Sequence, residues 1–325
     1  MKACLKAIAC ELPAAVEDNE FLVRQMALDW PAEDIYAKTG IRQRHIAAPD
    51  ECASDLAARA AERLFRRAPA LREKTDFLLF CSQSPDYVLP ATACLLQQRL
   101  GLSTASGALD INQGCSGFLY GLAVAKGLIE SGTARNVLLL MAETYSKYLA
   151  PDDKTTRPIF GDGAAAVWIA GEDTAADEPM GPFVLGTDGT GAENLIVRGR
   201  AGRREEGASP HLFMDGPEIF QFTLRAVPKT ARRLLEASGC AMEEIDYFVF
   251  HQANAFMLEH LRKKLKIPPE KFCLDLADTG NTVSASIPIA LARALERGAV
   301  RSGMRVMLMG FGVGYSWGGC LIRIP

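Results

Sequence analysis

The sequence has no C-x-x-C pair, and its nine cysteines do not cluster with its four histidines as metal ligands do. An odd number of unpaired cysteines disfavours a disulfide framework and favours a reducing compartment. No apolar run reaches the roughly 18–20 residues that a membrane helix needs, and the first residues do not resemble a signal peptide. The net charge of −3 creates no field that attracts nucleic acid. We therefore expect a cytoplasmic protein with neither a membrane nor a nucleic-acid partner.

The 325 residues are 49% hydrophobic, enough for a large core and about two domains of ordinary size. The chain also carries one pattern twice, in the order strand, helix, short run, long apolar helix and strand. The offset between matching elements stays between about 165 and 170 residues. The elements are 75–83, 91–100, 109–112, 116–131 and 136–141 in the first copy, and 245–252, 255–265, 274–276, 284–297 and 305–309 in the second.

Strands that alternate with helices predict mixed or parallel sheets covered by helices, so the fold class is α/β. Two copies predict two halves related by a pseudo-twofold axis. We place the halves at 1–172 and 182–325, because the acidic, proline-containing stretch 172–182 separates them. The stretch 187–216 is rich in Gly, Arg and Glu and predicts an excursion from the second half.

Ligand sites in such folds lie at the carboxyl ends of strands. This rule places Cys81, His251 and the loops after residues 112 and 276 at one end of the molecule.

Cys115 lies in that region, between a predicted strand and a helix that is apolar almost all round. A cysteine at the first turn of a helix is exposed to the positive end of the helix dipole, which favours the thiolate. Gly114 and Gly117 permit a tight turn that exposes the sulfur. A buried structural cysteine is the alternative, and we assign the other eight cysteines to packing.

His251 ends a predicted buried strand, and Asn281 lies at the repeat position that corresponds to the Cys115 turn. A hydrogen-bonded core histidine and a turn or N-cap asparagine are the structural alternatives. A cysteine, a histidine and an asparagine also occur together in cysteine proteases, but the local signatures of those enzymes are missing here.

Six motifs in order along the chain resemble β-ketoacyl-acyl-carrier-protein synthase III. They are 39–45 (TGIRQRH), the surroundings of Cys115, 160–165 (FGDGAA), 251–254 (HQAN), 280–282 (GNT) and 310–318 (GFGVGYSWG). The resemblance implies the five-layered αβαβα thiolase fold, a homodimer and a catalytic triad of Cys115, His251 and Asn281. It implies an acyl carrier protein partner, an acyl-CoA or acyl-carrier donor, no metal and no redox cofactor, in fatty-acid or secondary-metabolite biosynthesis.

The resemblance also implies a mechanism, a decarboxylative Claisen condensation. Cys115 takes an acyl group from a thioester and holds it covalently. His251 and Asn281 then stabilise the enolate that forms when a malonyl thioester loses carbon dioxide. Backbone N–H groups of Cys115 and Val313 hold the oxyanion that precedes the β-ketoacyl product. The implied substrate-binding residues are Leu89, Phe311, Lys38, Lys154, Phe220, Ala253 and Asn254.

Two of these residues depart from the family at its coenzyme A clamp. Lys38 and Lys154 replace arginines, and Asp34 stands where a tryptophan stacks on adenine. Trp30 lies four residues too early in the sequence to be counted as that tryptophan. We therefore expect weak binding of coenzyme A, or loading from a carrier protein.

Three further substitutions concern substrate access. Pro217 replaces an asparagine of the pantetheine wall, and Phe256 replaces an arginine linked to carrier docking. Leu89, expected to enter the partner's acyl pocket across the dimer interface, is smaller than the usual phenylalanine and leaves room for longer or branched acyl groups. Basic residues at helical spacing predict either a solvated face or a dock for an acidic carrier protein: Arg225, Lys229, Arg232, Arg233, Arg262, Lys263, Lys264 and Lys266.

Another function stays open, that of an acyltransferase of the same fold which passes the Cys115 acyl group to oxygen, nitrogen or another small nucleophile. Release of carbon dioxide from a malonyl thioester distinguishes the two. A non-catalytic subunit is disfavoured because Cys115, His251 and Asn281 are all present. A non-decarboxylating thiolase is disfavoured because Cys320 lies outside the loop at 312–317.

Overall fold

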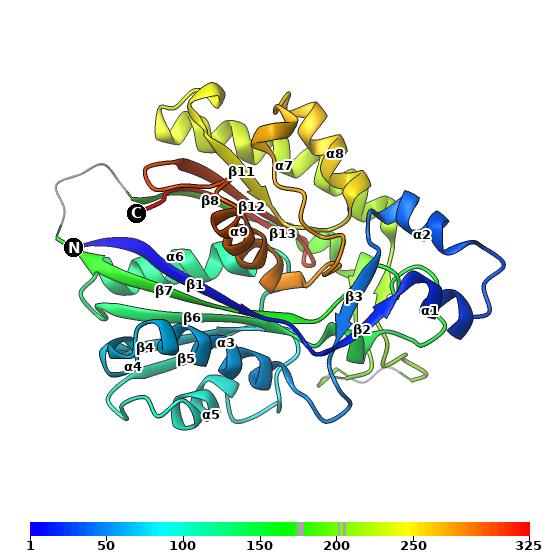
Figure 1. Cartoon of the computed structure of the whole chain (residues 1–325), viewed down its shortest axis with the longest axis horizontal. Coiled ribbons are helices and arrows are strands. Elements are labelled where there is room, and N and C mark those ends of the chain that lie inside the picture. The colour runs from blue at the N-terminus through cyan, green and yellow to red at the C-terminus, as the bar shows by residue number, and fades with distance from the viewer. Residues whose placement is uncertain (174–178, 201, 204–205) are drawn as a thin grey trace.

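A computed structural model describes residues 1–173, 179–200, 202–203 and 206–325. Parts of the predicted boundary at 172–182 and of the predicted excursion at 187–216 lie outside the described residues, at 174–178, 201 and 204–205. Two larger sheets organise the described ranges, with helices between them and on both outer sides (Figure 1).

The first sheet is built from residues 2–172. Its strand order is β1 (Lys2–Glu11), β7 (Gly163–Glu172), β6 (Asn136–Glu143), β4 (Phe77–Cys81) and β5 (Gly107–Ile111). Strand β4 is parallel to β5 and β6, whereas β7 runs antiparallel to β6 and β1. Strands β4 and β6 are almost continuously buried, which explains why their sequences are apolar without alternation.

The second sheet is built from residues 180–323. Its order is β11 (Tyr247–Phe250), β12 (Arg305–Gly312), β13 (Ser316–Arg323) and β8 (Met180–Thr187), with β11 parallel to β12 and the remaining pairs antiparallel. The run 274–276 matches the β5 region in the sequence repeat but forms no strand. A single bridge between Phe248 and Phe272 stands in its place.

Two apolar helices, α6 (Gly117–Glu130) and α9 (Ser286–Glu296), lie between the sheets (Figure 1). Helix α6 contacts β6 of the first sheet and β12 of the second, and α9 contacts β1 and β11. Because both faces of each helix meet a sheet, a sequence that is apolar nearly all round is what these positions require. The sequence predicted these two helices within two residues of their bounds.

Amphipathic helices cover the outer faces. Helices α3 (Ala53–Arg67), α4 (Ala70–Lys74) and α5 (Thr92–Arg99) lie on the first sheet, and α7 (Gly216–Ser238) and α8 (Ala255–Lys264) lie on the second (Figure 1). Helix α3 turns small alanines toward β1 and β7, so the helix packs closely on the sheet. The layers therefore run helix, sheet, helix, sheet, helix.

Smaller elements complete the described part of the chain. They are α1 (Asn19–Gln25), α2 (Ala32–Thr39), the pair β2 (Ala15–Asp18) and β3 (Gln43–Ile46), the pair β9 (Leu195–Ile196) and β10 (Phe213–Met214), and 3-10 turns at Tyr145–Tyr148, Gly189–Asn194, Met242–Glu244, Pro269–Lys271 and Val283–Ala285. Among the helices described, none has both the length and the apolar character to cross a membrane.

Candidate active site

Cys115 lies in the tight turn that connects β5 to α6, two residues before the helix begins, and only 6% of it is exposed. Strand β12 of the second half packs directly against this turn. A Cβ atom on Gly312 would lie 2.7 Å from the Cys115 Cβ and 2.8 Å from its sulfur, and one on Gly310 would lie 2.8 Å from the Cys115 carbonyl oxygen. Both glycines are therefore required for the second half to approach the cysteine.

The sulfur of Cys115 is held as a thiol. Burial raises the pKa of the Cys115 thiol to about 12, against the opposing effect of the backbone N–H groups of Val313 and of Cys115 itself. The sequence predicted a thiolate favoured by the helix dipole, whereas burial shifts the pKa of Cys115 in the opposite direction. The reason is that desolvation of the sulfur outweighs the dipole, whose first helical residue is Gly117 rather than Cys115.

His251 directly follows β11, with its ring buried. Its Nδ1 lies 2.7 Å from the Ser286 hydroxyl, which also accepts the Gln252 backbone N–H at 3.4 Å. The Ser286 hydroxyl has a proton of its own that it can donate to Nδ1, and this arrangement places the imidazole proton on Nε2, facing the cavity. Burial lowers the pKa of His251 to about 3, so the imidazole is neutral near pH 7 and offers one N–H donor.

Asn281 is held by backbone and side-chain bonds together. Its N–H donates to the Ile159 carbonyl at 2.9 Å, and its carbonyl accepts from Gly161 N–H at 3.0 Å. The Asn281 Oδ1 accepts the backbone N–H of Val283 at 2.9 Å. With Oδ1 engaged, the amide nitrogen Nδ2 is the donor that remains available.

Cys115, His251 and Asn281 line one cavity of about 130 Å³, which we call the catalytic cavity. The sulfur comes from the first half of the chain, and both N–H donors come from the second. Cys81 lies beside the same turn, since its thiol donates to the Gln113 carbonyl at 3.3 Å. The predicted convergence of strand ends is thus confirmed. The rest of the lining comprises Ile159, Phe160, Leu195, Met214, Gly216, Ile219, Ala253, Asn254, Met257, Phe311 and Gly312.

Of the predicted substrate-binding residues, three line this cavity: Phe311, Ala253 and Asn254. Asn254 also caps α8, because its side-chain oxygen accepts the Met257 N–H at 2.8 Å. Phe220 lies elsewhere, where its ring packs 5.5 Å from the ring of the exposed Phe256. Leu89 is 79% exposed and lines no described cavity of its own chain.

The amines of Lys38 and Lys154 both lie near the ring of Trp30. The Lys38 Nζ lies 4.9 Å from the centroid of the Trp30 ring, and the Lys154 Nζ lies 6.0 Å from it. The structure thus brings Trp30 to the two lysines expected at the clamp, although it lies four residues before the position of the family's tryptophan. Trp30 precedes Pro31, the N-cap of α2, and so lies outside the helix that contains Asp34 and Lys38. Its ring can therefore reach Lys38 without the spacing that a helix imposes.

A second cavity, of about 410 Å³, adjoins the nucleophile turn, and we call it the side cavity. Val313, whose N–H interacts with the Cys115 sulfur, lines it, and Leu195 lines both cavities. Gln83 also lines it and touches the turn, because a Cβ on Gly114 would lie 2.4 Å from the Gln83 Oε1. The rest of the lining comprises Pro85, Val88, Asn112, Tyr145, Tyr148, Ile196, Val197, Arg200 and Leu212.

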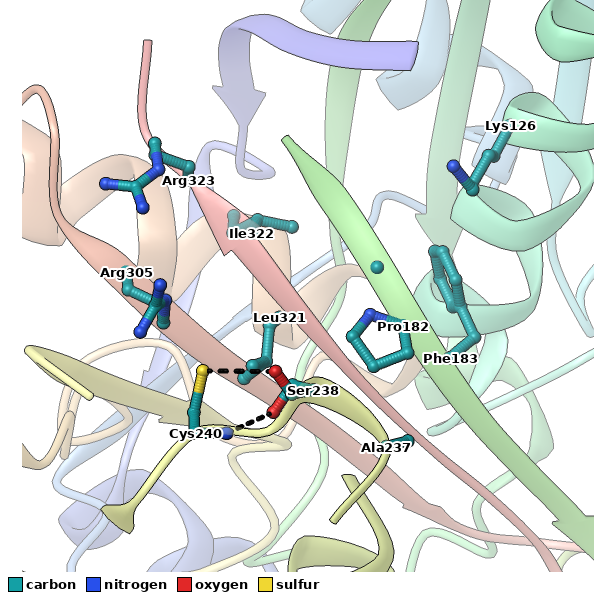
Figure 2. A pocket seen from close by; sticks show the side chains of 11 residues that line it. Lys126, Pro182, Phe183, Ala237, Ser238, Cys240, Arg305, Leu321, Ile322 and Arg323 are labelled. Atoms are coloured by element: carbon teal, nitrogen blue, oxygen red, sulfur yellow. Dashed lines mark hydrogen bonds between the residues drawn. The ribbon is translucent and has the colours of Figure 1, made fainter. Parts of the chain in front are cut away.

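A different cavity, of about 530 Å³, lies at the amino-terminal end of β12 (Figure 2). Lys126, Phe183 and Arg305 are among its lining residues. Lys126 pairs with Glu130 at 2.5 Å, and the Arg305 Nη1 lies 3.7 Å from the Glu244 carboxylate. No predicted site residue lines this cavity, so we do not include it in the candidate site.

Sequence reasoning missed a buried carboxyl group behind the turn. Glu143, the last residue of β6, is fully buried, and its oxygens accept from the Ser284 hydroxyl at 2.7 Å, the Ser84 hydroxyl at 2.8 Å and the Gln83 N–H at 3.1 Å. Ser284 belongs to the second half, so the carboxyl joins the two halves. Burial raises the pKa of Glu143 to about 7 despite these donors.

This raised pKa predicts a pH-dependent stability. The folded state binds the Glu143 proton more tightly than the unfolded state, so stability relative to Glu143→Gln falls as pH rises from about 4.5 to about 7. A shift of this size corresponds to ~3 kcal/mol. Urea unfolding of both proteins at pH 4.5, 6 and 8 measures the difference. The exposed Glu236→Gln is the control and is expected to follow the wild type; parallel curves for Glu143→Gln and wild type would contradict the prediction.

The five layers, with a buried cysteine from one half facing a histidine and an asparagine from the other, define a condensing enzyme of the thiolase fold. The model of 3-oxoacyl-[acyl-carrier-protein] synthase III matches residues 109–189, and that of its C-terminal part matches residues 235–324. The chain belongs to the 3-oxoacyl-[acyl-carrier-protein] synthase III family. The resemblance found in the motifs is confirmed.

Relatives match over nearly the full length. The β-ketoacyl-[acyl-carrier-protein] synthase III of Neisseria gonorrhoeae is 38% identical over 96% of both chains, and synthase III 3 of Streptomyces coelicolor is 38% identical over 97% of this chain and 95% of its own. A 2.1 Å crystal structure of a 3-oxoacyl-(acyl-carrier-protein) synthase III superimposes with a TM-score of 0.95, at 50% identity over the whole of both chains. The priming β-ketosynthase of the R1128 polyketide pathway gives 0.91 at 29% identity, over all of this chain and 96% of its own.

Proposed function

We propose that this enzyme joins an acyl group to a malonyl thioester carried on acyl carrier protein, by decarboxylative Claisen condensation through a Cys115 acyl-enzyme. The observation that carries the proposal is the catalytic cavity itself. The Cys115 thiol and two neutral N–H donors, on His251 and Asn281, line the same 130 Å³ space. Such a set suits a covalent step followed by stabilisation of an enolate.

The first part is acyl transfer. The Cys115 sulfur bonds to the acyl carbon of the donor thioester, the carbon–sulfur bond to the carrier breaks, and the thiol proton ends on the departing carrier thiol. The tetrahedral oxyanion forms next to the sulfur. The backbone N–H groups of Cys115 and Val313, which already interact with the Cys115 sulfur, are the donors proposed for it.

The second part is decarboxylation and bond formation. The malonyl thioester carbonyl accepts hydrogen bonds from His251 Nε2 and Asn281 Nδ2, and carbon dioxide leaves as the enolate forms. The enolate carbon then bonds to the acyl carbon, and the Cys115 sulfur departs and regains a proton. A histidine with a pKa of about 3 suits this role, because it stays neutral at pH 7. Its N–H then donates a hydrogen bond to the enolate oxygen without transferring the proton.

Acyl carrier protein and an acyl-CoA or acyl-carrier donor are the proposed partners, together with a second copy of the chain. Residues 87–89 form an exposed apolar loop in which Val88 is 91% exposed and Leu89 79%. Contiguous exposed apolar side chains are typical of a protein interface, which supports the proposal that Leu89 enters the partner's acyl pocket.

Trp30, beside Lys38 and Lys154, is the residue that we propose stacks on the adenine of an acyl-CoA donor. We expect Trp30→Ala to weaken acylation by an acyl-CoA by about tenfold to a hundredfold, because loss of one stacked ring costs ~1–3 kcal/mol. Acylation by the same acyl group on a carrier protein is expected to stay unchanged, since no adenine is present. The measurement is the concentration dependence of Cys115 acylation by intact mass. Equal effects on both donors would show that Trp30 has only a structural role.

One experiment decides between condensation and transfer to another nucleophile. The enzyme is incubated with an acyl donor and malonyl-carrier protein, and both carbon dioxide and the β-ketoacyl product are quantified. Condensation produces the two in equal amounts. Turnover of the acyl-enzyme without carbon dioxide would support the acyltransferase and reject the proposed function.

A further inference from the structure

The side cavity and the catalytic cavity both adjoin the Cys115 turn, and Leu195 lines both of them. Val313 reaches the sulfur with its N–H and lines the side cavity, while Gln83 lines the side cavity and touches Gly114. His251 and Asn281 line only the catalytic cavity. For an acyl chain on Cys115 that leaves the catalytic cavity free for a second thioester, the side cavity is the adjoining space.

Most of the side cavity is apolar, as a chain of methylene groups requires. Leu195, Ile196, Val197, Leu212 and Val88 supply this part of the lining. The remainder is polar. Tyr148 is held in place there, because its hydroxyl donates to the Gln83 carbonyl at 2.8 Å.

Arg200 is the cationic member of this lining. Its Nε donates to the Pro210 carbonyl and its Nη2 to the Lys147 carbonyl, both at 2.8 Å, and its guanidinium lies 5.0 Å from the centroid of the Tyr148 ring. These contacts fix the position of the guanidinium. Neutral carbonyls accept from it, and no carboxylate of the described residues forms an ion pair with it.

Arg200 is exposed, and the neighbouring, half-buried Arg198 differs from it in having an anionic partner. Arg198 pairs with Glu193 and lies over the ring of Phe213. A guanidinium held over an apolar cavity by neutral acceptors, with Nη1 left to donate, instead has the geometry of an anion receptor.

We propose that the acyl group loaded on Cys115 ends in a carboxylate, which Arg200 binds at the polar side of the side cavity. This inference rests on the proposed function, because it concerns the starter of the same reaction. The matching substrates are thioesters of short dicarboxylic acids, attached through one carboxyl group. The methylene groups contact the leucine and valine lining, and the free carboxylate meets the guanidinium.

The test compares thioesters that differ only at the far end. Glutaryl-CoA is set against pentanoyl-CoA, and adipyl-CoA against hexanoyl-CoA, with the rate of Cys115 acylation measured by intact mass. The wild type is expected to prefer the carboxylated member of at least one pair. Arg200→Gln is expected to lower that preference about tenfold, as for loss of one charge-assisted hydrogen bond. Arg200→Lys is expected to retain part of it.

Arg198→Gln is the matched control, with the same change two residues away, and is expected to leave the preference unchanged. Acylation by the unsubstituted members alone, or a preference that Arg200→Gln does not alter, would overturn the inference while the proposed function stands. Failure of every one of these acyl groups to acylate Cys115, whether presented on coenzyme A or on a carrier protein, would instead reject the proposed function. The two failures are therefore distinguishable.

Discussion

Cys115→Ala is expected to abolish the acyl-enzyme completely and leave the fold intact. Cys115 is the cysteine that lines the catalytic cavity together with His251 and Asn281. Alanine removes the one thiol among the residues that line this cavity and fits the space that Gly312 leaves. Intact mass after incubation with an acyl donor measures the adduct, and circular dichroism checks the fold.

The control for that prediction is Cys94→Ala, which removes an exposed thiol from α5. This variant is expected to gain the acyl mass at the wild-type rate. If Cys115→Ala still gained it, a different nucleophile would have to carry the acyl group, and the exposed thiol is the first to be tested by the double variant.

His251→Ala and Asn281→Ala are each expected to lower decarboxylation of the malonyl thioester by a factor on the order of 10²–10³, which is typical for removal of one oxyanion donor. Acylation of Cys115 is expected to persist, because the proposed donors for that step are backbone N–H groups. The two half-reactions are measured separately, by release of carbon dioxide and by intact mass. Undiminished release of carbon dioxide from either variant would reject its assigned role.

Ser286→Ala is the graded member of this series. A Ser286 hydroxyl that donates to Nδ1 favours the tautomer with its proton on Nε2, so its loss is expected to free the ring to adopt the other tautomer. A loss of up to about tenfold in decarboxylation is expected, as for one neutral hydrogen bond. The exposed Ser131→Ala at the far end of α6 is the matched control and is expected to have no effect.

Most of the architecture could be predicted because it depends on local patterns. Continuous apolar runs predict β4 and β6, and the lack of a polar face predicts that α6 and α9 are buried between the sheets. The repeat then aligned the strand ends, and with them Cys115, His251 and Asn281. The run at 274–276 matches β5 in the repeat but forms no strand, and its three residues are too few to show a period from which this could be predicted.

The missed residues have long-range partners instead of local signals. Glu143 meets Ser284 across 141 residues, and Arg200 is held by the Lys147 carbonyl across 53. The Trp30 ring lies near the Lys154 amine because the chain before α2 brings it there. A single sequence contains no period or spacing that connects such pairs, so only the folded arrangement reveals them.

The predicted thiolate failed for another physical reason. The helix dipole could be inferred from the position of Cys115, but the depth of burial could not. A helix start contributes modestly to the stability of a thiolate, whereas desolvation of a buried thiolate costs more, and burial accordingly raises the pKa of Cys115 to about 12.

The glycines of β12 that admit the Cys115 turn have a consequence for protein engineering. Each half presents an incomplete surface that only the other half fills, and the Ser116 and Ser316 hydroxyls hydrogen-bond across this seam at 2.6 Å. A chimera that exchanges whole halves between relatives therefore needs a Cys115 turn and a strand β12 whose surfaces fit each other. Compatibility of such recombinants depends on the few atoms around Gly310 and Gly312 more than on average identity between the parents.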